Sequence, residues 1–282
     1  MSAKQIVYLN GDFLPIEEAR VPVLDRGFIF GDGVYEVVPV YGGRPFRWAQ
    51  HLARLERSLD KVGIANPLDT AGWTTLVDML VARHPWPDQF VYMQVTRGVA
   101  RRDHAYPKGV APTVFAMASE FPPVAPALLA SGVSAISLPD ERWLHCDIKS
   151  TSLLGNVMAR QKAVEAGAAE CVMFRDGFLT EGSASNIWVV RKGTVFGPPR
   201  DNLVLEGIRY GLMGELCDRA GLPMELRRIV HAEVLAADEL LLTSATKEVL
   251  AITELDGKPV GSGKPGPIWK RLHEAYQQAK AA

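Results

Sequence analysis

A proline-rich segment near the middle of the chain constrains the fold more than any other stretch. EFPPVAPA, residues 120–127, holds three prolines in eight residues, and proline favours extended backbone. The chain has 282 residues, 48% of them hydrophobic, which is enough to bury two ordinary cores. We therefore expect a smaller α+β domain over 1–119, a linker over 120–127 and a larger domain over 128–282. The expected fold class is α+β or α/β.

Turn residues predict that the first domain opens with antiparallel strands. Asn10-Gly11 separates two apolar runs, and both residues tolerate the positive φ of a hairpin turn. Gly42-Gly43 repeats this pattern further along the chain. Pro39, in the second hairpin, has no N–H to donate to a neighbouring strand, which predicts an edge strand or a bulge at that position.

Helical spacing of apolar residues predicts the main helices. Trp48, Leu52 and Leu59 share one face of a helix expected over 47–63, which ends near Gly63. The other expected helices cover 70–83, 152–166, 207–220 and the last part of the chain. In the second domain, strands are expected around 132–138, 170–174 and 186–196.

Composition argues against several kinds of partner. The formal net charge is −1, so no basic field attracts nucleic acid or an anionic membrane. No stretch approaches the roughly 18 consecutive apolar residues of a membrane span, and the first residues lack a signal peptide's apolar core. Three widely spaced cysteines without a CxxC motif argue against a disulfide framework and a zinc site. We expect a soluble, cytoplasmic protein that binds no metal and acts on a small molecule.

The stretch RWLHCDIKSTSLLGN, residues 142–156, offers candidate reactive groups. Adjacent side chains diverge, so His145, Cys146 and Asp147 are a poor metal site and a poor nucleophile pair. Lys149 differs, because a lysine among apolar and small residues loses its proton more easily and can then act as a nucleophile. Its position alone favours an ordinary surface lysine at a helix N-terminus.

Other polar residues offer a binding site. Glu181 lies in a turn rich in small hydroxyl groups, between two expected strands. Arg102 and His104 lie in a loop bounded by glycine and proline, where a guanidinium and an imidazole can together bind a carboxylate. Basic loops are more often simply solvated, and a carboxylate in a turn is more often only a polar turn.

Several segments, taken in order, resemble the class IV (fold-type IV) pyridoxal-phosphate aminotransferases. They are DRGFIFGDGVYE (25–36), HLARLERS (51–58), DIKSTSLLGNVMARQKA (147–163) and TEGSASNIWVV (180–190), supported by LEGI (205–208) and LLTSATKEV (241–249). The ordered set is specific, although no single segment is decisive. The resemblance covers most of the chain and implies a two-domain fold-type IV architecture.

The resemblance also implies a role for individual residues. Lys149 matches the lysine that forms a Schiff base with pyridoxal 5′-phosphate. Glu181 matches the carboxylate that faces the pyridine nitrogen and keeps it protonated, and Arg54 matches the arginine that binds the cofactor phosphate. The helix start at Gly207 would bind the same phosphate through its free N–H groups. The remaining cofactor contacts implied in this way are Leu205, Ile208 and Arg209.

The implied reaction consists of two half-reactions with ping-pong kinetics. In the first, an amino acid gives up its amino group and leaves as an oxo acid, while the Lys149 amine moves the Cα proton. In the second, another oxo acid is aminated by the reverse steps.

The segment around Tyr35 and the loop with Arg102 and His104 resemble the D-amino acid transaminases. In that branch a tyrosine and an Arg-x-His pair bind the substrate α-carboxylate, and the pair comes from the neighbouring subunit. The resemblance thus implies a homodimer with its site at the subunit interface. It also implies D-alanine-like donors, with 2-oxoglutarate or pyruvate as acceptor.

Three departures from the family pattern and several alternative functions remain. Pro39 lies where a lysine is common, which concerns substrate range; Arg209 and Ala245 lie where threonines are common, which concerns cofactor affinity. The alternatives are an (R)-selective amine transaminase or mixed D-amino acid and (R)-amine activity, an L-branched-chain aminotransferase, and a catalytically silent cofactor-binding protein. Arg102 and His104 argue against a pure amine enzyme, because an amine brings no carboxylate to pair with them.

Overall fold

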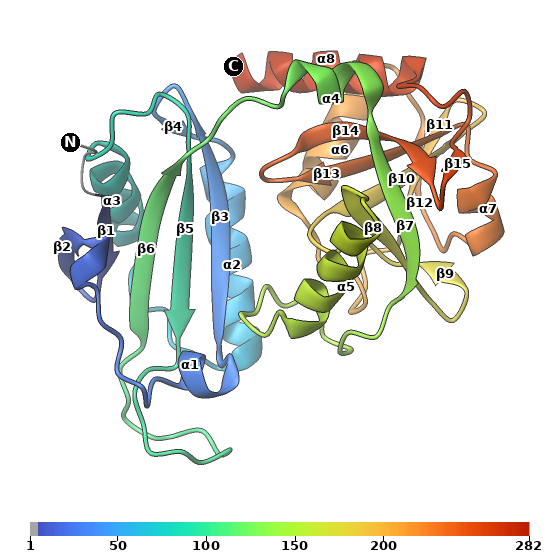
Figure 1. Cartoon of the computed structure of the whole chain (residues 1–282). Coiled ribbons are helices and arrows are strands. Elements are labelled where there is room, and N and C mark those ends of the chain that lie inside the picture. Colours follow the sequence, from blue (N-terminus) through green and yellow to red (C-terminus); the bar gives the residue numbers. More distant parts are fainter. Residues whose placement is uncertain (1–4, 282) are drawn as a thin grey trace. The chain divides into compact units, whose positions relative to one another are not determined.

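The computed structural model describes residues 5–281, apart from the side chain of Arg209. These residues divide into two compact units, each built around its own sheet (Figure 1). Within the same range, no helix is long and apolar enough to cross a membrane.

The division between the units falls inside the expected linker. The first unit is the chain up to Pro122 together with Ile148–Leu153, and the second is the remainder. Part of the expected linker is helical, because α4 (Pro126–Ser131) starts within it. Proline suits the first position of a helix, where no N–H is needed, so a proline-rich segment need not be extended along its whole length.

In the described residues the sheet of the first unit is antiparallel, with its strands in the order β2, β1, β6, β5, β3, β4 (Figure 1). The strands are β1 (Ile6–Leu9), β2 (Asp12–Pro15), β3 (Gly33–Tyr41), β4 (Arg44–Pro45), β5 (Gln89–Thr96) and β6 (Thr113–Glu120). A 3-10 helix, Ile16–Glu18, follows β2. Both predicted hairpins are confirmed, with positive φ at Asn10, Gly11, Gly42 and Gly43.

Pro39 lies in β3 directly before the residues that pair with β4. It pairs with Phe90 of β5 in unbroken register, whereas β4 pairs only with Val40 and Tyr41. The Pro39 carbonyl accepts a hydrogen bond from Phe46 N at 2.7 Å. The N and C=O of one strand residue point to the same side, so the missing N–H faces away from β5. The expected edge position is wrong, because β4 lies outside β3 in the sheet and Phe46 bonds to Pro39 on that side; the alternative, a bulge, is absent from the pairing with β5.

Two helices pack on one face of the first sheet, α2 (Trp48–Val62) and α3 (Thr70–Val81) (Figure 1). The predictions of helices over 47–63 and 70–83 are confirmed. α2 ends at Gly63 with φ 62°, a left-handed conformation that glycine adopts without strain. Most of the core between sheet and helices is apolar; its apolar residues include Val34, Val38, Val91, Met93, Leu52, Leu55, Leu59, Trp73, Val77 and Leu80.

The segment Ile148–Leu153 extends the first unit at the N-terminal end of β3. Tyr35 N donates to Lys149 O at 2.9 Å, and Thr151 N donates to Gly33 O at 2.9 Å. These bonds form here because β4 covers only the opposite end of β3. The segment that carries Lys149 therefore groups with the first unit, although we expected it in the larger domain.

The second unit contains a mixed sheet in the order β12, β11, β10, β13, β14, β7, β8, β9, with β15 paired to β14. β7 runs parallel to β8 and β14, and β11 runs parallel to β12. The strands are β7 (Val133–Pro139), β8 (Glu170–Arg175), β9 (Phe178–Leu179), β10 (Asn186–Arg191), β11 (Thr194–Gly197), β12 (Met224–Leu226), β13 (Glu239–Ser244), β14 (Glu248–Leu255) and β15 (Lys258–Pro259).

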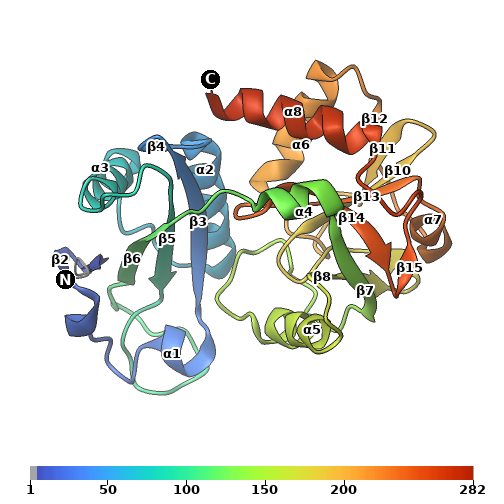
Figure 2. The same ribbon diagram turned by 45° about the horizontal axis from the view of Figure 1, so that its top comes forward.

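The helices of the second unit pack around this sheet. After α4 they are α5 (Leu154–Glu165), α6 (Ile208–Arg219), α7 (His231–Leu235) and α8 (Pro267–Ala281), which confirms the expected helices near 152–166, 207–220 and the chain end. Figure 2 shows α5 beside β7 and β8. There Ala159 and Ala163 pack against Cys171 and Met173, while Val172 points into the core on the other face of β8. Small residues on α5 allow this close approach.

Candidate active site

Lys149 is held by backbone contacts next to an aromatic ring. Its N–H donates to Ser58 Oγ at 3.3 Å, and its carbonyl accepts from Tyr35 N at 2.9 Å. The ammonium Nζ lies 4.0 Å from the centroid of the Tyr35 ring. Tyr35 itself stacks on Tyr92 at 5.6 Å between centroids. The structure thus brings together Lys149 and Tyr35, which sequence reasoning placed in one site.

Arg54, on the buried face of α2, is fixed by a carboxylate of the first sheet. Its Nε and Nη2 donate to the two oxygens of Glu36 at 2.7 and 2.8 Å, and His51 Nδ1 lies 2.8 Å from Glu36 Oε2. Burial raises the pKa of Glu36, but Arg54 and His51 outweigh burial and hold that pKa well below its ordinary value. A two-point contact of this kind fixes the plane of the guanidinium.

Sequence reasoning missed Glu36, although a signal was present. The residue occupies an inward position of β3, between Val34 and Val38, where an apolar side chain is the norm. An acidic residue at such a position indicates a buried cationic partner.

We predict that Glu36→Gln destabilises the protein by about 3 kcal/mol at pH 7, because it leaves Arg54 buried without its counter-charge. The pKa of Glu36 is lowered on folding, so its contribution is present above the ordinary value of 4.5 and is lost as pH falls below it. The difference between wild type and variant in the free energy of urea unfolding should therefore be smaller at pH 3 than at pH 7.

A pH-independent difference would contradict this account of Glu36. Glu56→Gln is the matched control, because Glu56 lies on the exposed face of the same helix. Its free energy of unfolding is expected to stay within about 0.5 kcal/mol of wild type.

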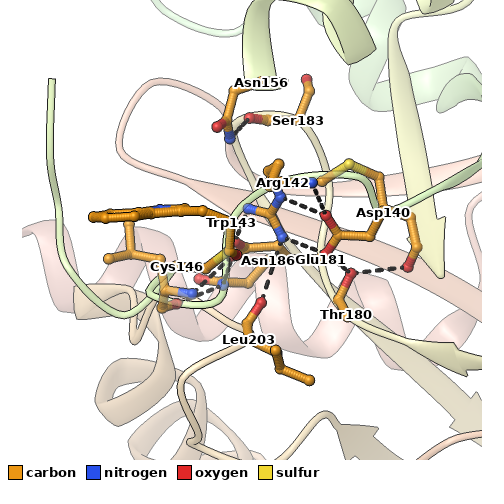
Figure 3. Close-up of polar contacts among 12 residues, drawn as sticks. Asp140, Arg142, Trp143, Cys146, Asn156, Thr180, Glu181, Ser183, Asn186 and Leu203 are labelled. Atoms are coloured by element: carbon orange, nitrogen blue, oxygen red, sulfur yellow. Dashed lines mark hydrogen bonds and ion pairs between the residues drawn. The ribbon is translucent and has the colours of Figure 1, made fainter. Parts of the chain in front are cut away.

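Glu181, in the second unit, is buried and receives hydrogen bonds on both oxygens (Figure 3). Arg142 Nη1 donates to Oε1, while Asn186 Nδ2 and Leu205 N each donate to Oε2 at 3.2 Å. Leu205, expected to contact the cofactor, is thus joined to Glu181 through its backbone. Its carbonyl also accepts from Asn186 Nδ2 at 3.0 Å.

Arg142 joins Glu181 to a second carboxylate (Figure 3). Its Nε and Nη2 donate to the two oxygens of Asp140 at 2.9 and 2.8 Å, and Thr180 Oγ1 donates to Asp140 Oδ2 at 2.8 Å. Burial raises the pKa of Asp140, but the hydrogen bond from Arg142 outweighs it and lowers that pKa to about 2. Asp140 therefore carries the negative charge that balances Arg142 at neutral pH.

Glu181 differs from Asp140 in its protonation. Burial raises the pKa of Glu181 to about 7, against the opposing effect of Arg142. A carboxyl group with this pKa changes its charge easily near neutral pH. A cation placed beside it, such as a protonated ring nitrogen, would favour the ionised form.

The serines after Glu181 serve a different carboxylate. Ser183 and Ser185 both donate through Oγ to Glu170, which lies fully buried, and Lys247 Nζ lies 3.6 Å from Glu170 Oε2. Through their bonds to Glu170, these small hydroxyl groups thus anchor the turn that carries Glu181. Glu170 was not singled out in the sequence, since it begins an apolar strand and belongs to no motif.

The expected phosphate-binding segment starts α6. Gly207 precedes the helix with extended backbone, φ −62° and ψ 149°, and Ile208 is its first residue. No side chain caps the first turn at Gly207. The Arg209 side chain lies outside the described part of the structure.

Arg102 and His104 lie exposed in the connection between β5 and β6. Both flank Phe30, the last residue of α1 (Arg26–Phe30): Arg102 Cζ lies 5.4 Å from the centroid of that ring, and the His104 ring centroid lies 5.4 Å from it. Among the described residues, both side chains thus lie beside the same ring, and none of their ring contacts is with Tyr35 or Lys149. Within residues 5–281, no group of three or more His, Cys, Asp or Glu side chains could hold a metal ion.

Comparison with known proteins adds to this geometry. Residues 33–255 match the family described as amino-transferase class IV. The D-alanine aminotransferase of Bacillus licheniformis is 42% identical over 274 residues, which is 97% of this chain and 96% of that protein. The branched-chain amino acid aminotransferase of Escherichia coli has a similar structure, with TM-score 0.92, 21% identity and 98% and 94% of the two chains covered. A hypothetical aminotransferase from Mycobacterium tuberculosis, in a PLP-bound form, matches with TM-score 0.85 and 23% identity over 97% and 98%.

Proposed function

The chain belongs to the class IV aminotransferases, and from this membership we propose that it transfers the amino group of D-alanine-like D-amino acids to a 2-oxo acid. The observation that carries the proposal is Tyr35, held beside the Lys149 amine, in a chain 42% identical to a D-alanine aminotransferase. The acceptor we propose is 2-oxoglutarate or pyruvate.

The residues present fit pyridoxal 5′-phosphate as cofactor. This cofactor supplies an aldehyde that captures amines and an electron-poor ring that stabilises negative charge at the substrate Cα. Lys149 is the amine for the aldehyde, and Arg54 is a rigidly held cation for the phosphate. Glu181, with a pKa near 7, suits a site beside the ring nitrogen, where it becomes the counter-charge of a protonated nitrogen.

The side chains of this chain then have separate roles in the reaction. Unprotonated Lys149 Nζ would take the proton from Cα of the donor and pass it to the former aldehyde carbon of the cofactor; in the second half-reaction it would move a proton in the reverse direction, onto Cα of the acceptor. Glu181 holds the ring nitrogen in its protonated form. Arg142, already neutralised by Asp140, keeps the Glu181 carboxylate in one orientation through its hydrogen bond.

The orientation of the substrate in the site depends on the groups that bind its carboxylate. We propose Tyr35 together with Arg102 and His104, the last two from the partner subunit. The relative with the higher identity, 42%, is a D-alanine aminotransferase, whereas the branched-chain enzyme at 21% supports the fold alone. This difference favours D-amino acids over L-branched-chain amino acids.

A homodimer is part of the proposal. Phe28 and Val23, on and before α1, are 75% and 72% exposed, and Leu24 and Val99 beside them are also exposed. An apolar surface next to the Arg102 loop suits burial against a second copy. The three cysteines are all free and buried, which suits a reducing compartment such as the cytoplasm.

Arg102→Ala tests the proposed function directly. We predict a fall of about 10²-fold in kcat/KM for D-alanine, because the variant loses a charge-assisted contact to the α-carboxylate. The assay follows pyruvate release with 2-oxoglutarate as acceptor. Arg57→Ala, an exposed arginine on α2, is the control and should keep wild-type kinetics.

Mixing two impaired variants tests where Arg102 acts. In a heterodimer of Arg102→Ala and Lys149→Ala subunits, one site combines an intact Lys149 with an intact Arg102 of the partner subunit. Random exchange should restore about a quarter of the wild-type sites. No recovery after confirmed subunit exchange would mean that Arg102 serves its own subunit.

A further inference from the structure

The loop that carries Arg102 and His104 is anchored by a buried cluster in the first unit. Asp32 bonds two arginines at once: Arg26 Nε donates to its Oδ2 at 2.7 Å, while Arg97 Nε and Nη2 donate to Oδ2 and Oδ1 at 2.8 and 3.0 Å. We call Arg26, Asp32 and Arg97 the Asp32 cluster. Burial raises the pKa of Asp32, but the two arginines outweigh it and lower that pKa.

Arg26 contacts the loop through the backbone around His104. Its Nη1 donates to the carbonyls of Asp103 and Ala105, and its Nη2 donates to the carbonyl of His104 at 3.5 Å. Only 4% of the Arg26 side chain is exposed, so these bonds are shielded from water. Asp103 also closes the turn, because its Oδ1 accepts from Ala105 N at 3.1 Å.

Arg97 contacts the same loop from its other end. The Arg97 guanidinium carbon lies 3.5 Å from the centroid of the Tyr106 ring, which stacks over it. Nη1 and Nη2 of Arg97 donate to the carbonyls of Gly63 and Val62 at 2.8 and 2.6 Å. Arg97 therefore links three parts of the unit: it bonds to the end of α2, pairs with Asp32 and stacks on Tyr106 of the loop.

The Asp32 cluster contacts the loop at two places: Arg26 bonds to the carbonyls of residues 103–105, and Arg97 stacks on the Tyr106 ring. Exposed loops without buried contacts have many conformations, and ordering them costs free energy when a ligand binds. The bonds from Arg26 remove this cost for the short turn between Arg102 and Tyr106. Phe30, on the same α1 as Arg26, adds a ring against which Arg102 and His104 both lie.

We propose that Arg26, held by Asp32, is a positioning residue that orders the Arg102–His104 loop for binding of the substrate carboxylate. This inference rests on the proposed function of Arg102 and His104. It adds to it a residue that contacts neither substrate nor cofactor and acts on substrate affinity through the loop.

The test is a double-mutant cycle with Arg26→Lys and Arg102→Ala. Lysine keeps a charge for Asp32 but lacks the planar guanidinium, in which Nε bonds to Asp32 while Nη1 and Nη2 bond to the loop carbonyls. Single-turnover loss of the yellow absorption of the holoenzyme, at increasing D-alanine, gives an apparent dissociation constant and a limiting rate. Arg26→Lys is expected to raise the dissociation constant about tenfold with the limiting rate within about twofold.

Non-additivity separates positioning from general stabilisation. If Arg26 acts through the loop, Arg26→Lys should change the dissociation constant less than about twofold once Arg102 is absent. Titration with pyridoxal phosphate should give an unchanged affinity for the variant. Arg20→Lys is the matched control, since Arg20 also donates to backbone carbonyls, those of Glu17 and Ala19, away from the loop.

Each outcome bears on a different claim. If the effects of Arg26→Lys and Arg102→Ala on the dissociation constant multiply in the double variant, the inference is overturned and the proposed function still stands. Wild-type holoenzyme that D-alanine does not bleach would overturn both. Should Arg26→Lys fail to fold, Arg26→Gln replaces it, because the shorter side chain loses the bonds to the carbonyls of residues 103–105 while Arg97 still pairs with Asp32. An unchanged D-alanine affinity in Arg26→Gln would then overturn the inference.

Discussion

Lys149→Ala is expected to lower turnover of D-alanine by about 10⁴-fold, the largest effect of any single substitution in this chain. In the proposed mechanism the amine of Lys149 carries the Cα proton in both half-reactions, and no other lysine belongs to the Ile148–Leu153 segment beside β3. Pyruvate release from D-alanine with 2-oxoglutarate measures the loss.

The control for this variant is Lys162→Ala. Lys162 lies on α5 and has a half-exposed side chain near Glu141, so its removal should leave kcat unchanged. If Lys149→Ala kept more than about a tenth of wild-type turnover, the proton transfer would belong to another group.

Glu181→Gln is expected to lower the D-alanine half-reaction by about 10²-fold to 10³-fold. Glutamine keeps the size of the side chain but cannot become a counter-charge for a protonated ring nitrogen. Arg142 keeps its ion pair with Asp140 in the variant, so the fold of this region should persist. Rapid mixing of holoenzyme with D-alanine gives the rate, and near-ultraviolet circular dichroism reports the fold.

A matched variant is Glu165→Gln, which changes an exposed carboxylate at the end of α5. It should react at the wild-type rate. A Glu181→Gln enzyme as fast as Glu165→Gln would show that the Glu181 charge has no part in the reaction, whatever its burial.

Local patterns in the sequence predicted the elements that frame the site. Gly63 ends α2 where the apolar spacing stops, and the Asn10-Gly11 turn joins β1 to β2. These features depend on neighbouring residues only, so spacing and turn chemistry suffice to find them. Pro39 differs from them, because only the fold shows that its missing N–H lies on the side of Phe46 and that the pairing with β5 stays intact.

Contacts between distant residues were harder to predict. The partners of Glu181 are Arg142, Asn186 and Leu205 N, and the partner of Arg54 is Glu36. Periodicity shows which residues are buried but not which buried charges meet. The placement of Lys149 with the first unit has the same origin, because it depends on hydrogen bonds to β3 far away in the sequence.

The carboxylate-binding groups remain a proposal for a further reason. Tyr35 lies in β3 beside Lys149, while Arg102 and His104 lie in an exposed loop against Phe30. A site completed by a second subunit cannot be assembled from the contacts of one chain. The resemblance to D-amino acid transaminases, and not spacing or burial, brought these residues into one hypothesis.

The most direct test of the account is to add D-alanine, L-alanine and (R)-1-phenylethylamine separately to yellow holoenzyme without an acceptor. Loss of the yellow absorption reports transfer of the amino group from the donor. The account predicts loss with D-alanine and none with L-alanine or the amine. Loss with L-alanine would contradict it, because the carboxylate would then bind on the other side of the site, and loss with the amine would show that no carboxylate is needed.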